Sequence, residues 1–493
     1  MEQLDIFEVL YPKFKIDKPI RLIEMFAGYG SQAFALKYLG IPFEHHRICE
    51  WAVPSIQAYK DAHFTEDNED YSRYFTKDHI IEFLYNRGIS MDYNAPMTLE
   101  QIKRLKEEQL RTIYNNIYAT HNLVNIQKTK GRDLDITEQD KYIYMLTYSF
   151  PCQDLSLAGL GKGMSRDANT RSGMLWEVER ILDDCSLDRC LPQILLMENV
   201  PQVIGEKNLG DFISWRGKLE SLGYSNYVEV LNAKDYGVPQ NRQRCFMVSI
   251  LGDYSYTFPN KNPLEKRLKD LLEDEVDESF YLSDKQINQV IHWNAQQEPF
   301  ETLGKPVSPT LTTRSGAYAA GMVLTSNLEQ DEEKTVGEQL LRIKEATKKG
   351  YKEAYEGDGI DISSRMDTHR GTVQKGMCQT LKTSIDIGVV VKDEPIVLGG
   401  IGEKLSNNGT QWYQQDRIYD DNVAISVTTV CNPYYRSNLR IRKLTPKECF
   451  RLMGVRDEDY ENIAKRQSVN KLYHLAGDSI VVDVLMAIFK NMI

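Results

Sequence analysis

The sequence predicts an α/β domain joined to a smaller, irregular and mainly β domain. Residues 21–39 have the pattern of a short apolar strand, a glycine-containing turn and a helix, with which nucleotide-binding α/β units begin. Two further apolar runs, residues 142–148 and 194–197, have the length and composition of buried strands. After Pro259 this alternation of strands and helices stops, which indicates that a second domain begins there.

Composition describes a soluble globular protein of 493 residues, long enough for two or more domains. The formal net charge of -11 argues against indiscriminate binding to nucleic acid but permits a local basic cleft. The 8 cysteines include no Cys-x-x-Cys pair, so neither a metal site nor a disulfide framework is predicted and a reducing cytoplasm fits best. The N-terminus lacks the basic start of a signal peptide, and we expect no membrane-spanning segment.

The first predicted strand leads into a turn that contains Gly28 and Gly30. These glycines would let the backbone approach a ligand, whose polar end would face the N–H groups of the following helix, although an ordinary tight turn has the same pattern. A second strand, residues 46–49, ends at Glu50 and Trp51. A carboxylate there can accept hydrogen bonds from two ribose hydroxyls, and the indole can stack on adenine. A surface glutamate and a core tryptophan are the alternatives.

Residues from about 60 to 118 have a polar, amphipathic helical pattern, which we interpret as a helical insertion. Residues 100–118 are predicted to form one long helix, whose alternating charges are typical of a solvated face. We assign no chemistry to this insertion. Strand character resumes at residues 123–126, where Asn125 is expected to lie at the same ligand edge.

A cysteine follows a proline just after the strand at residues 142–148. Pro151 fixes the backbone φ where the strand ends, and Cys152 is expected at the strand's carboxyl end, which is where ligands bind in open α/β sheets. The alternative is a small buried hydrophobic residue. Residues 154–173 are rich in glycine, serine and basic residues, which favours a polar loop that closes over the thiol.

Other reactive groups follow later strands. The next buried strand ends in Glu198, a second candidate catalytic group. Gln240, Arg242 and Arg244 alternate, so their side chains are predicted to share one face of an extended segment. A thiolate suits attack on an electron-poor ring carbon, a carboxylic acid can protonate a ring nitrogen, and guanidiniums can hold a ring carbonyl oxygen. Together these groups fit attack on a pyrimidine.

The second domain contains short β-like runs, such as residues 389–391 and 396–398, and polar or aromatic loops that can read base edges. The pattern becomes helical again from Arg440, with Thr445 and Pro446 as a helix start, and a last apolar helix is predicted from residue 476. We therefore expect three segments, residues 1–259, 260–438 and 439–493, of which the last returns to the first domain.

Seven motifs follow one another along nearly the whole chain: Phe26–Gly30, Glu50–Trp51, Phe150–Gln153, Glu198–Val200, Gln240-x-Arg242-x-Arg244, Arg442–Gly454 and Gly477–Ile480. Their order resembles that of the DNA (cytosine-5)-methyltransferase family of prokaryotic and phage restriction-modification systems. The resemblance implies a class I S-adenosylmethionine-dependent methyltransferase fold, which is Rossmann-like. It also implies that the second domain is a target-recognition domain.

The resemblance implies that double-stranded DNA is the substrate and that its target cytosine flips into the pocket. Cys152 would add to carbon 6, Glu198 would protonate or hydrogen-bond ring nitrogen 3, and Arg244, with Arg242 nearby, would hold the base carbonyl. Carbon 5 would then take a methyl group from S-adenosylmethionine, and β-elimination would free Cys152.

The resemblance also assigns binding residues. Those implied for the cofactor are Phe26, Gly28, Gly30, Glu50, Trp51, Asn125, Pro151, Asp478 and Ser479. Those implied for DNA are Gln153, Ser156 and Gln240. Two positions depart from the family pattern. The family usually has an aspartate near the position of Asn125 that contacts the adenine, and Asp133 and Asp135 are the other candidates for this contact. The family usually has asparagine where this chain has Asp478, which can only accept hydrogen bonds when ionised.

Two other functions are open. A transfer-RNA methyltransferase of the same fold is the nearer, although the long second domain favours DNA. A non-catalytic DNA-binding protein is the other, against which the presence of Cys152, Glu198 and both arginines speaks. We expect a monomer that acts alone or beside a separately encoded restriction endonuclease.

Overall fold

The computed structural model divides the chain into two compact units. Unit 1 comprises Met1–Glu273, Cys378–Ile385 and Thr445–Ile493, and unit 2 comprises Asp274–Met377 and Asp386–Leu444. The structure describes residues 12–152, 155, 163–166, 171–282, 340–362, 371–383, 387–392 and 439–493. The first boundary thus follows Glu273 rather than Pro259, and residues 378–385 return to unit 1 in the middle of the segment predicted to form the second domain.

Unit 1 is built on a six-stranded sheet of order β2-β1-β3-β4-β7-β5. Its strands are β1 (Ile20–Met25), β2 (Phe43–Cys49), β3 (Ile143–Tyr148), β4 (Ile194–Asn199), β5 (Tyr224–Asn232) and β7 (Gln243–Leu251). Neighbours among β1 to β4 are parallel, and β7 runs antiparallel between β4 and β5. The predicted α/β class is confirmed. Because β1 lies between β2 and β3, the chain reverses direction across the sheet there, which places a ligand crevice at the carboxyl ends of β1 and β3.

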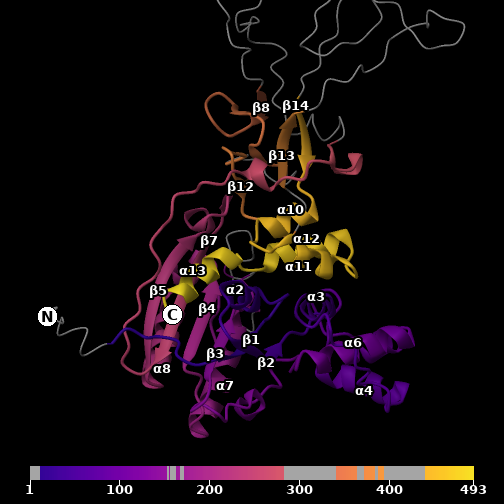
Figure 1. Ribbon diagram of the computed structural model, residues 1–493, viewed down its shortest axis with the longest axis vertical. Helices are drawn as coiled ribbons and strands as arrows, with labels where there is room; N and C mark the ends of the chain where they lie inside the picture. The colour runs from indigo at the N-terminus through magenta and orange to yellow at the C-terminus, as the bar shows by residue number, and fades with distance from the viewer. Residues whose placement is uncertain are drawn as a thin grey trace, which may run out of the picture. The chain divides into compact units, whose positions relative to one another are not determined.

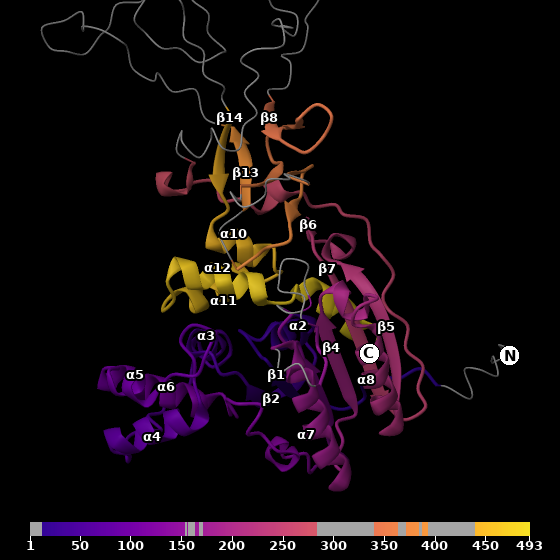
Figure 2. The same cartoon turned by 180° about the vertical axis from the view of Figure 1, so that it is seen from behind.

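Helices cover both faces of this sheet (Figures 1 and 2), and β3 and β4 are accordingly buried along their whole lengths. The helices α7 (Leu175–Leu187) and α8 (Leu209–Ser221) pack on one face. The helices α2 (Ser31–Leu39) and α13 (Val482–Lys490) lie against each other on the opposite face. Trp215 of α8 anchors the first face, since its indole N–H donates to the hydroxyl of Tyr148 at 3.1 Å.

The insertion forms a helical cluster with α3 (Val53–His63), α4 (Lys77–Arg87), α5 (Leu99–Lys103) and α6 (Glu107–Ala119), around its own apolar core. The prediction of one helix over residues 100–118 is wrong. The chain breaks at Lys106, whose backbone N–H is capped by the side chain of Gln109, and α6 starts afresh. The predicted strand at residues 123–126 is also wrong, because Val124 has a φ of 70°, which a β-strand does not allow.

The C-terminal segment differs from the prediction in two places. Residues 439–443 form strand β14 (Leu439–Lys443) of unit 2 rather than a helix. Helix α10 (Pro446–Arg451) begins after Thr445 as predicted, in a capping box with Glu448, and α11 (Asp457–Ala464) follows. The last predicted helix is instead two, α12 (Val469–Asp478) and α13, which are separated at Ser479.

The two final helices bear on the expectation that the chain has no membrane-spanning segment. Val469–Lys490 is long and apolar enough to cross a bilayer by length and composition, contrary to that expectation. Most of the segment is buried within the protein, however, and the break between α12 and α13 interrupts it. These features are those of a core element.

Unit 2 is small and β-rich among the residues that are described. Its four-stranded sheet has the order β11-β10-β13-β14, and β8 pairs with β9. The bounds are β8 (Leu341–Lys344), β9 (Tyr351–Ala354), β10 (Gly359–Asp361), β11 (Val373–Gln374) and β13 (Ile387–Lys392). A short core that includes Ile343, Ile360 and Val390 holds them together. The β-like run at residues 396–398 lies outside the described residues.

Candidate functional site

The strand register of unit 1 lines up the ends of four parallel strands. Met25 pairs with Cys49 on one side and with Tyr148 on the other, and Tyr148 pairs with Met197. The residue that follows each member of this row therefore emerges at the same edge of the sheet. These next residues are Phe26, Glu50, Ser149 and Glu198.

A cavity of about 420 Å³ lies at this edge. It is lined by most of the residues proposed from the sequence: Phe26, Gly28, Glu50, Trp51, Asn125, Pro151, Cys152, Glu198, Arg242, Arg244, Asp478 and Ser479. Gly30 and Gln240 do not line it. Gln153 and Ser156, the other predicted DNA contacts, lie outside the described residues. The structure thus brings the candidate nucleophile, the acid and the ligand turn into one space.

The turn after β1 is tied to the end of β2. Gly28 has a φ of 55°, and its backbone N–H donates to Oε2 of Glu50 at 3.0 Å. The backbone N–H of Ala52 donates to Oε1 of the same carboxylate at 2.7 Å. Burial nevertheless raises the pKa of Glu50 to about 7. The Gly28 N–H is therefore engaged by the protein, and each carboxylate oxygen keeps a lone pair for a ligand hydroxyl.

Gly30 has a different task from the one predicted. Its φ is 84°, and a Cβ built there would lie 2.4 Å from Nε2 of His63 and 2.7 Å from the ring of Tyr59. The position caps the N-terminus of α2 and needs glycine because the helix α3 packs against it. Close packing against α3, rather than contact with a ligand, explains the glycine at position 30.

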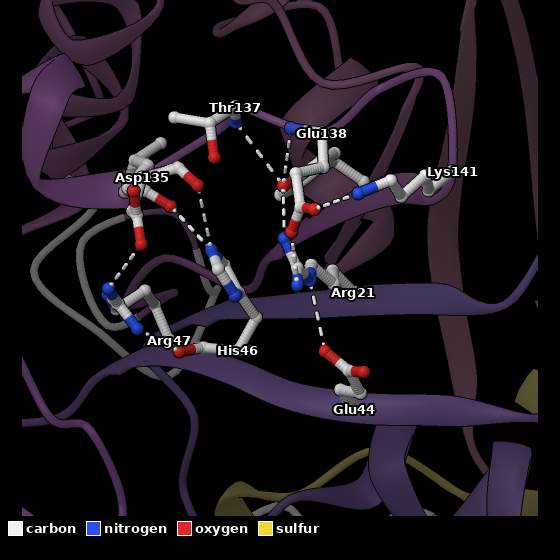
Figure 3. Close-up of polar contacts among 10 residues, drawn as sticks. Arg21, Glu44, His46, Arg47, Asp135, Thr137, Glu138 and Lys141 are labelled. Atoms are coloured by element: carbon white, nitrogen blue, oxygen red, sulfur yellow. Dashed lines mark hydrogen bonds and ion pairs between the residues drawn. The ribbon is translucent and has the colours of Figure 1, made fainter.

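The three candidates for the adenine contact, Asn125, Asp133 and Asp135, differ in whether they line the cavity. Asp135 accepts from Arg47 of β2 at 2.9 Å, in a polar network beside the strand (Figure 3). Asp133 accepts from the backbone N–H of Lys130 at 2.8 Å and neither aspartate lines the cavity. Asn125 does line it. Of the three, only Asn125 is placed to meet a ligand.

The acid at the site is held from two sides. Oε1 of Glu198 pairs with Nε of Arg244 at 3.0 Å. Oε2 accepts a short hydrogen bond from the hydroxyl of Ser149. Ser149 lies three residues before Cys152, and both line the cavity with Glu198. This arrangement fixes the carboxyl beside the thiol.

The environment of Cys152 keeps the sulfur protonated at rest. Burial raises the pKa of the thiol, the Arg244 guanidinium lowers it, and the Glu198 and Asp478 carboxylates raise it, with a net shift above the ordinary value. Nucleophilic attack requires the thiolate. The proton must therefore leave when substrate has entered.

Arg242 lines the cavity with Arg244, and both of its terminal guanidinium nitrogens donate to backbone carbonyl groups. Its side chain is 3% exposed. Its guanidinium donates to the carbonyl of Leu381 at 3.1 Å, of Gly477 at 2.9 Å and of Ser479 at 2.6 Å. Burial, followed by repulsion from Arg244, lowers the pKa of Arg242 to about 9, so it stays charged at neutral pH. Arg242 ties the last motif and the returning segment 378–385 to the sheet.

Gln240 is also a structural residue, which corrects the prediction of a DNA contact. Its side chain is fully buried. The amide donates to the carbonyl of Leu452 at 2.8 Å and accepts from the N–H of Leu381 at 3.2 Å. The short strand β6 (Gln240–Asn241) pairs in parallel with β12 (Cys378–Gln379) at this point. The amide is therefore committed to joining segments of unit 1.

Among the cavity residues that were not predicted from the sequence are Ser149, Tyr93 and His474. Ser149 directly precedes the Phe150–Gln153 motif but has no special signal, since serine is common in turns. Tyr93, from the insertion, and His474, from α12, pack with ring centroids 3.9 Å apart. These two are far apart in sequence, and only tertiary packing brings them to the cavity.

Comparison with known proteins was made by sequence. The model of the family "C-5 cytosine-specific DNA methylase" matches residues 101–493. The chain is 39% identical over 270 residues to the orphan methyltransferase M.SssI of Spiroplasma monobiae, covering 54% of this chain and 68% of that protein. It is 37% identical over 274 residues to the type II methyltransferase M2.ScrFI of Lactococcus lactis subsp. cremoris, covering 55% and 72%.

A phage enzyme extends the match. The orphan methyltransferase M.SPRI of Bacillus phage SPR is 28% identical over 391 residues, covering 71% of this chain and 82% of that protein. The residues that the family model matches include Cys152 and Glu198. The chain therefore belongs to the C-5 cytosine-specific DNA methylase family of bacterial and phage modification enzymes.

Proposed function

We propose that this chain transfers a methyl group from S-adenosylmethionine to carbon 5 of cytosine in DNA, at the cavity that contains Cys152. The observation that carries the proposal is that one space is lined by a thiol, a carboxyl held by Arg244, and the Glu50 carboxylate. Nucleophile, acid and cofactor anchor are the parts that this chemistry requires.

The residues of the cavity fit S-adenosylmethionine. Glu50 offers two fixed carboxylate oxygens for ribose hydroxyls, and Trp51 and Phe26 offer aromatic surface for a purine. Asn125 offers an amide for the edge of the base. When bound, the cofactor supplies an electrophilic methyl group. No metal takes part in the proposed reaction.

We assign the steps on cytosine to three side chains. The base must leave the duplex to reach a thiol at the bottom of a cavity. The Cys152 thiolate adds to carbon 6, while Glu198 gives a proton or hydrogen bond to nitrogen 3 and Arg244 holds the Glu198 carboxyl. Carbon 5 becomes nucleophilic and is methylated, after which loss of its proton expels Cys152.

Unit 2 supports the proposal that methylation is sequence-specific. It is a separate β-rich unit that inserts between parts of unit 1 in the sequence. Such a unit offers loops for base edges in a groove, which the catalytic cavity does not. We further propose a monomer in the cytoplasm, acting on double-stranded DNA with or without a separately encoded restriction endonuclease.

The proposal is tested by incubating the full chain with methyl-labelled S-adenosylmethionine and duplex DNA of varied sequence, with transfer RNA assayed in parallel. We expect label in duplex DNA, and bisulfite sequencing then identifies the modified cytosines. Label in transfer RNA alone would replace the DNA substrate by RNA. Label in neither would refute the methyltransferase activity.

Glu50 makes cofactor affinity depend on pH. Since burial raises its pKa to about 7, the carboxyl is largely protonated below neutrality and ionised above it. Ribose hydroxyls donate better to the ionised form, so the affinity for the cofactor should rise between pH 6 and pH 8. The rise should be at most about tenfold, because the ionised fraction of a group with this pKa increases by about that factor over the interval. Titration calorimetry with S-adenosylmethionine at both pH values measures the change.

The matched variants are Glu50→Gln and Glu44→Gln. The first should bind more weakly at both pH values and lose the dependence, because an amide does not titrate in this range. The second alters an exposed glutamate that pairs with Arg21, and should keep the wild-type slope. A pH-independent affinity in the wild type would contradict the role given to Glu50.

A further inference from the structure

Asp478 lies in the last of the seven motifs, Gly477–Ile480. It is the final residue of α12 and lines the cavity. Arg242 holds the carbonyl groups of the residues on both sides, Gly477 and Ser479. The backbone of Asp478 is therefore fixed relative to the sheet, although its side chain is 54% exposed.

His474 and Tyr93 lie beside the carboxylate of Asp478. Nε2 of His474, one helical turn earlier, lies 3.1 Å from Oδ2 of Asp478. The ring of Tyr93 packs on the His474 ring at 3.9 Å. Tyr93 has a φ of 63°, a conformation rare outside glycine, which tertiary packing must maintain. The insertion thus supports the wall of the cavity that carries Asp478.

The charge of Asp478 affects the pKa values of two groups in the cavity. Burial is the main cause of the raised pKa of Glu50, and Asp478 adds to it. Burial likewise dominates the raised pKa of Cys152, to which Asp478 also adds. Asp478 therefore lies within electrostatic reach of both the proposed ribose anchor and the nucleophile. In the proposed reaction, the cofactor is anchored at Glu50 and its methyl group goes to the base that Cys152 attacks.

We propose that Asp478 supplies a negative charge by which the cavity selects the positively charged methyl donor over its neutral demethylated product. The inference rests on the proposed function. S-adenosylmethionine carries a sulfonium, whereas S-adenosylhomocysteine carries an uncharged thioether, and the two are otherwise alike. A carboxylate in this region stabilises the first and not the second, while asparagine has the same shape without the charge.

The selection has a consequence for turnover. Methyl transfer removes the positive charge that Asp478 attracts, so the product is held less tightly than the donor was. The enzyme is thereby protected from inhibition by S-adenosylhomocysteine. The half-exposed position of the side chain limits the effect to a modest ratio, because water screens the charge.

The test compares three ligands by titration calorimetry on the full chain. These are S-adenosylmethionine, S-adenosylhomocysteine and sinefungin, an unreactive analogue with a protonated amine in place of the methylsulfonium. In Asp478→Asn, the preference for S-adenosylmethionine over S-adenosylhomocysteine should fall by about fivefold. The preference for sinefungin over S-adenosylhomocysteine should fall in parallel, since it depends on the same charge.

Asp188→Asn is the matched control, because it removes the same charge from an exposed position outside the cavity. It should keep the wild-type preference. A second measurement needs no variant: raising the salt concentration from 0.05 M to 1 M should lower the wild-type preference, since salt screens exposed charges.

The outcomes separate the two proposals. If the wild type binds none of the three ligands, the proposed cofactor is wrong and the inference fails with it. If the wild type binds them and Asp478→Asn, with an unchanged melting temperature, keeps the full preference, only the role of Asp478 is overturned. If Asp478→Asn does not fold, a wild-type preference that is independent of salt would overturn that role.

Discussion

Replacing Cys152 with alanine is expected to abolish methyl transfer, with the rate on duplex DNA falling by at least about a thousandfold. Without the sulfur, no covalent bond forms at carbon 6, and carbon 5 of cytosine is too weak a nucleophile to take the methyl group. The variant should still fold and bind S-adenosylmethionine, because the sulfur forms only part of the wall of the cavity. Labelled methyl transfer and titration calorimetry measure the two effects separately.

Cys190→Ala is the matched control. That thiol is also partly buried and free, but it lies beyond the end of α7, away from the cavity. It should retain wild-type activity. A Cys152→Ala enzyme that methylates DNA at more than a hundredth of the wild-type rate would refute covalent catalysis by this residue.

A second experiment tests covalent catalysis by trapping the adduct between the enzyme and DNA. Duplex DNA with 5-fluorocytosine at the target should trap the wild type covalently, because fluorine at carbon 5 cannot leave as a proton does. Peptide mapping should place the link on Cys152. Absence of an adduct at a site that the enzyme methylates would show that another nucleophile is used.

The site could be predicted from sequence where it follows directly from strand ends. Glu50, Cys152 and Glu198 each lie at or just beyond the end of a predicted strand, and parallel strands in register bring such residues to one edge. Only the local pattern of each strand is needed to infer this edge. The order of the strands places Glu198 and Arg244 beside Cys152, which favours a reactive thiol over a buried hydrophobic residue.

Arg242 and Arg244 both line the cavity, but the local pattern does not show what each of them contacts. Alternation puts side chains on one face only within a continuous strand. Here β6 ends at Asn241 and β7 begins at Gln243, and the N–H of Arg242 donates instead to Gln240 and to the side chain of Asn232. Arg242 is buried at the break between the two strands and donates to backbone carbonyl groups, while Arg244 pairs with Glu198.

Long-range packing explains what else sequence could not reveal. Gly28 and Gly30 look equivalent in the motif, yet only the surroundings of Gly30, the rings of His63 and Tyr59, exclude a side chain there. The contact between Tyr93 and His474 joins the insertion to α12. No local signal marks a contact across that distance in the chain.

Replacing Arg242 with alanine is expected to destabilise the protein by about 3 to 5 kcal/mol. Three buried carbonyl groups, those of Leu381, Gly477 and Ser479, would lose a charged donor together. Arg242→Lys should lose less, since one ammonium can satisfy part of this set but lacks the planar fork. The free energy of unfolding, from denaturant titration followed by intrinsic fluorescence, measures both.

Arg216→Ala provides the reference, because that arginine makes a solvent-exposed pair with Glu220 on α8 and its loss should cost no more than about 1 kcal/mol. The decisive comparison is between the folded fraction of Arg242→Lys and the amount of covalent adduct that it forms. If Arg242 is structural, Arg242→Lys should trap 5-fluorocytosine DNA in proportion to its folded fraction, because Arg244 still holds Glu198. An Arg242→Lys enzyme with wild-type stability but no adduct would show that the guanidinium acts on the substrate, and the catalytic role predicted from the sequence would be restored.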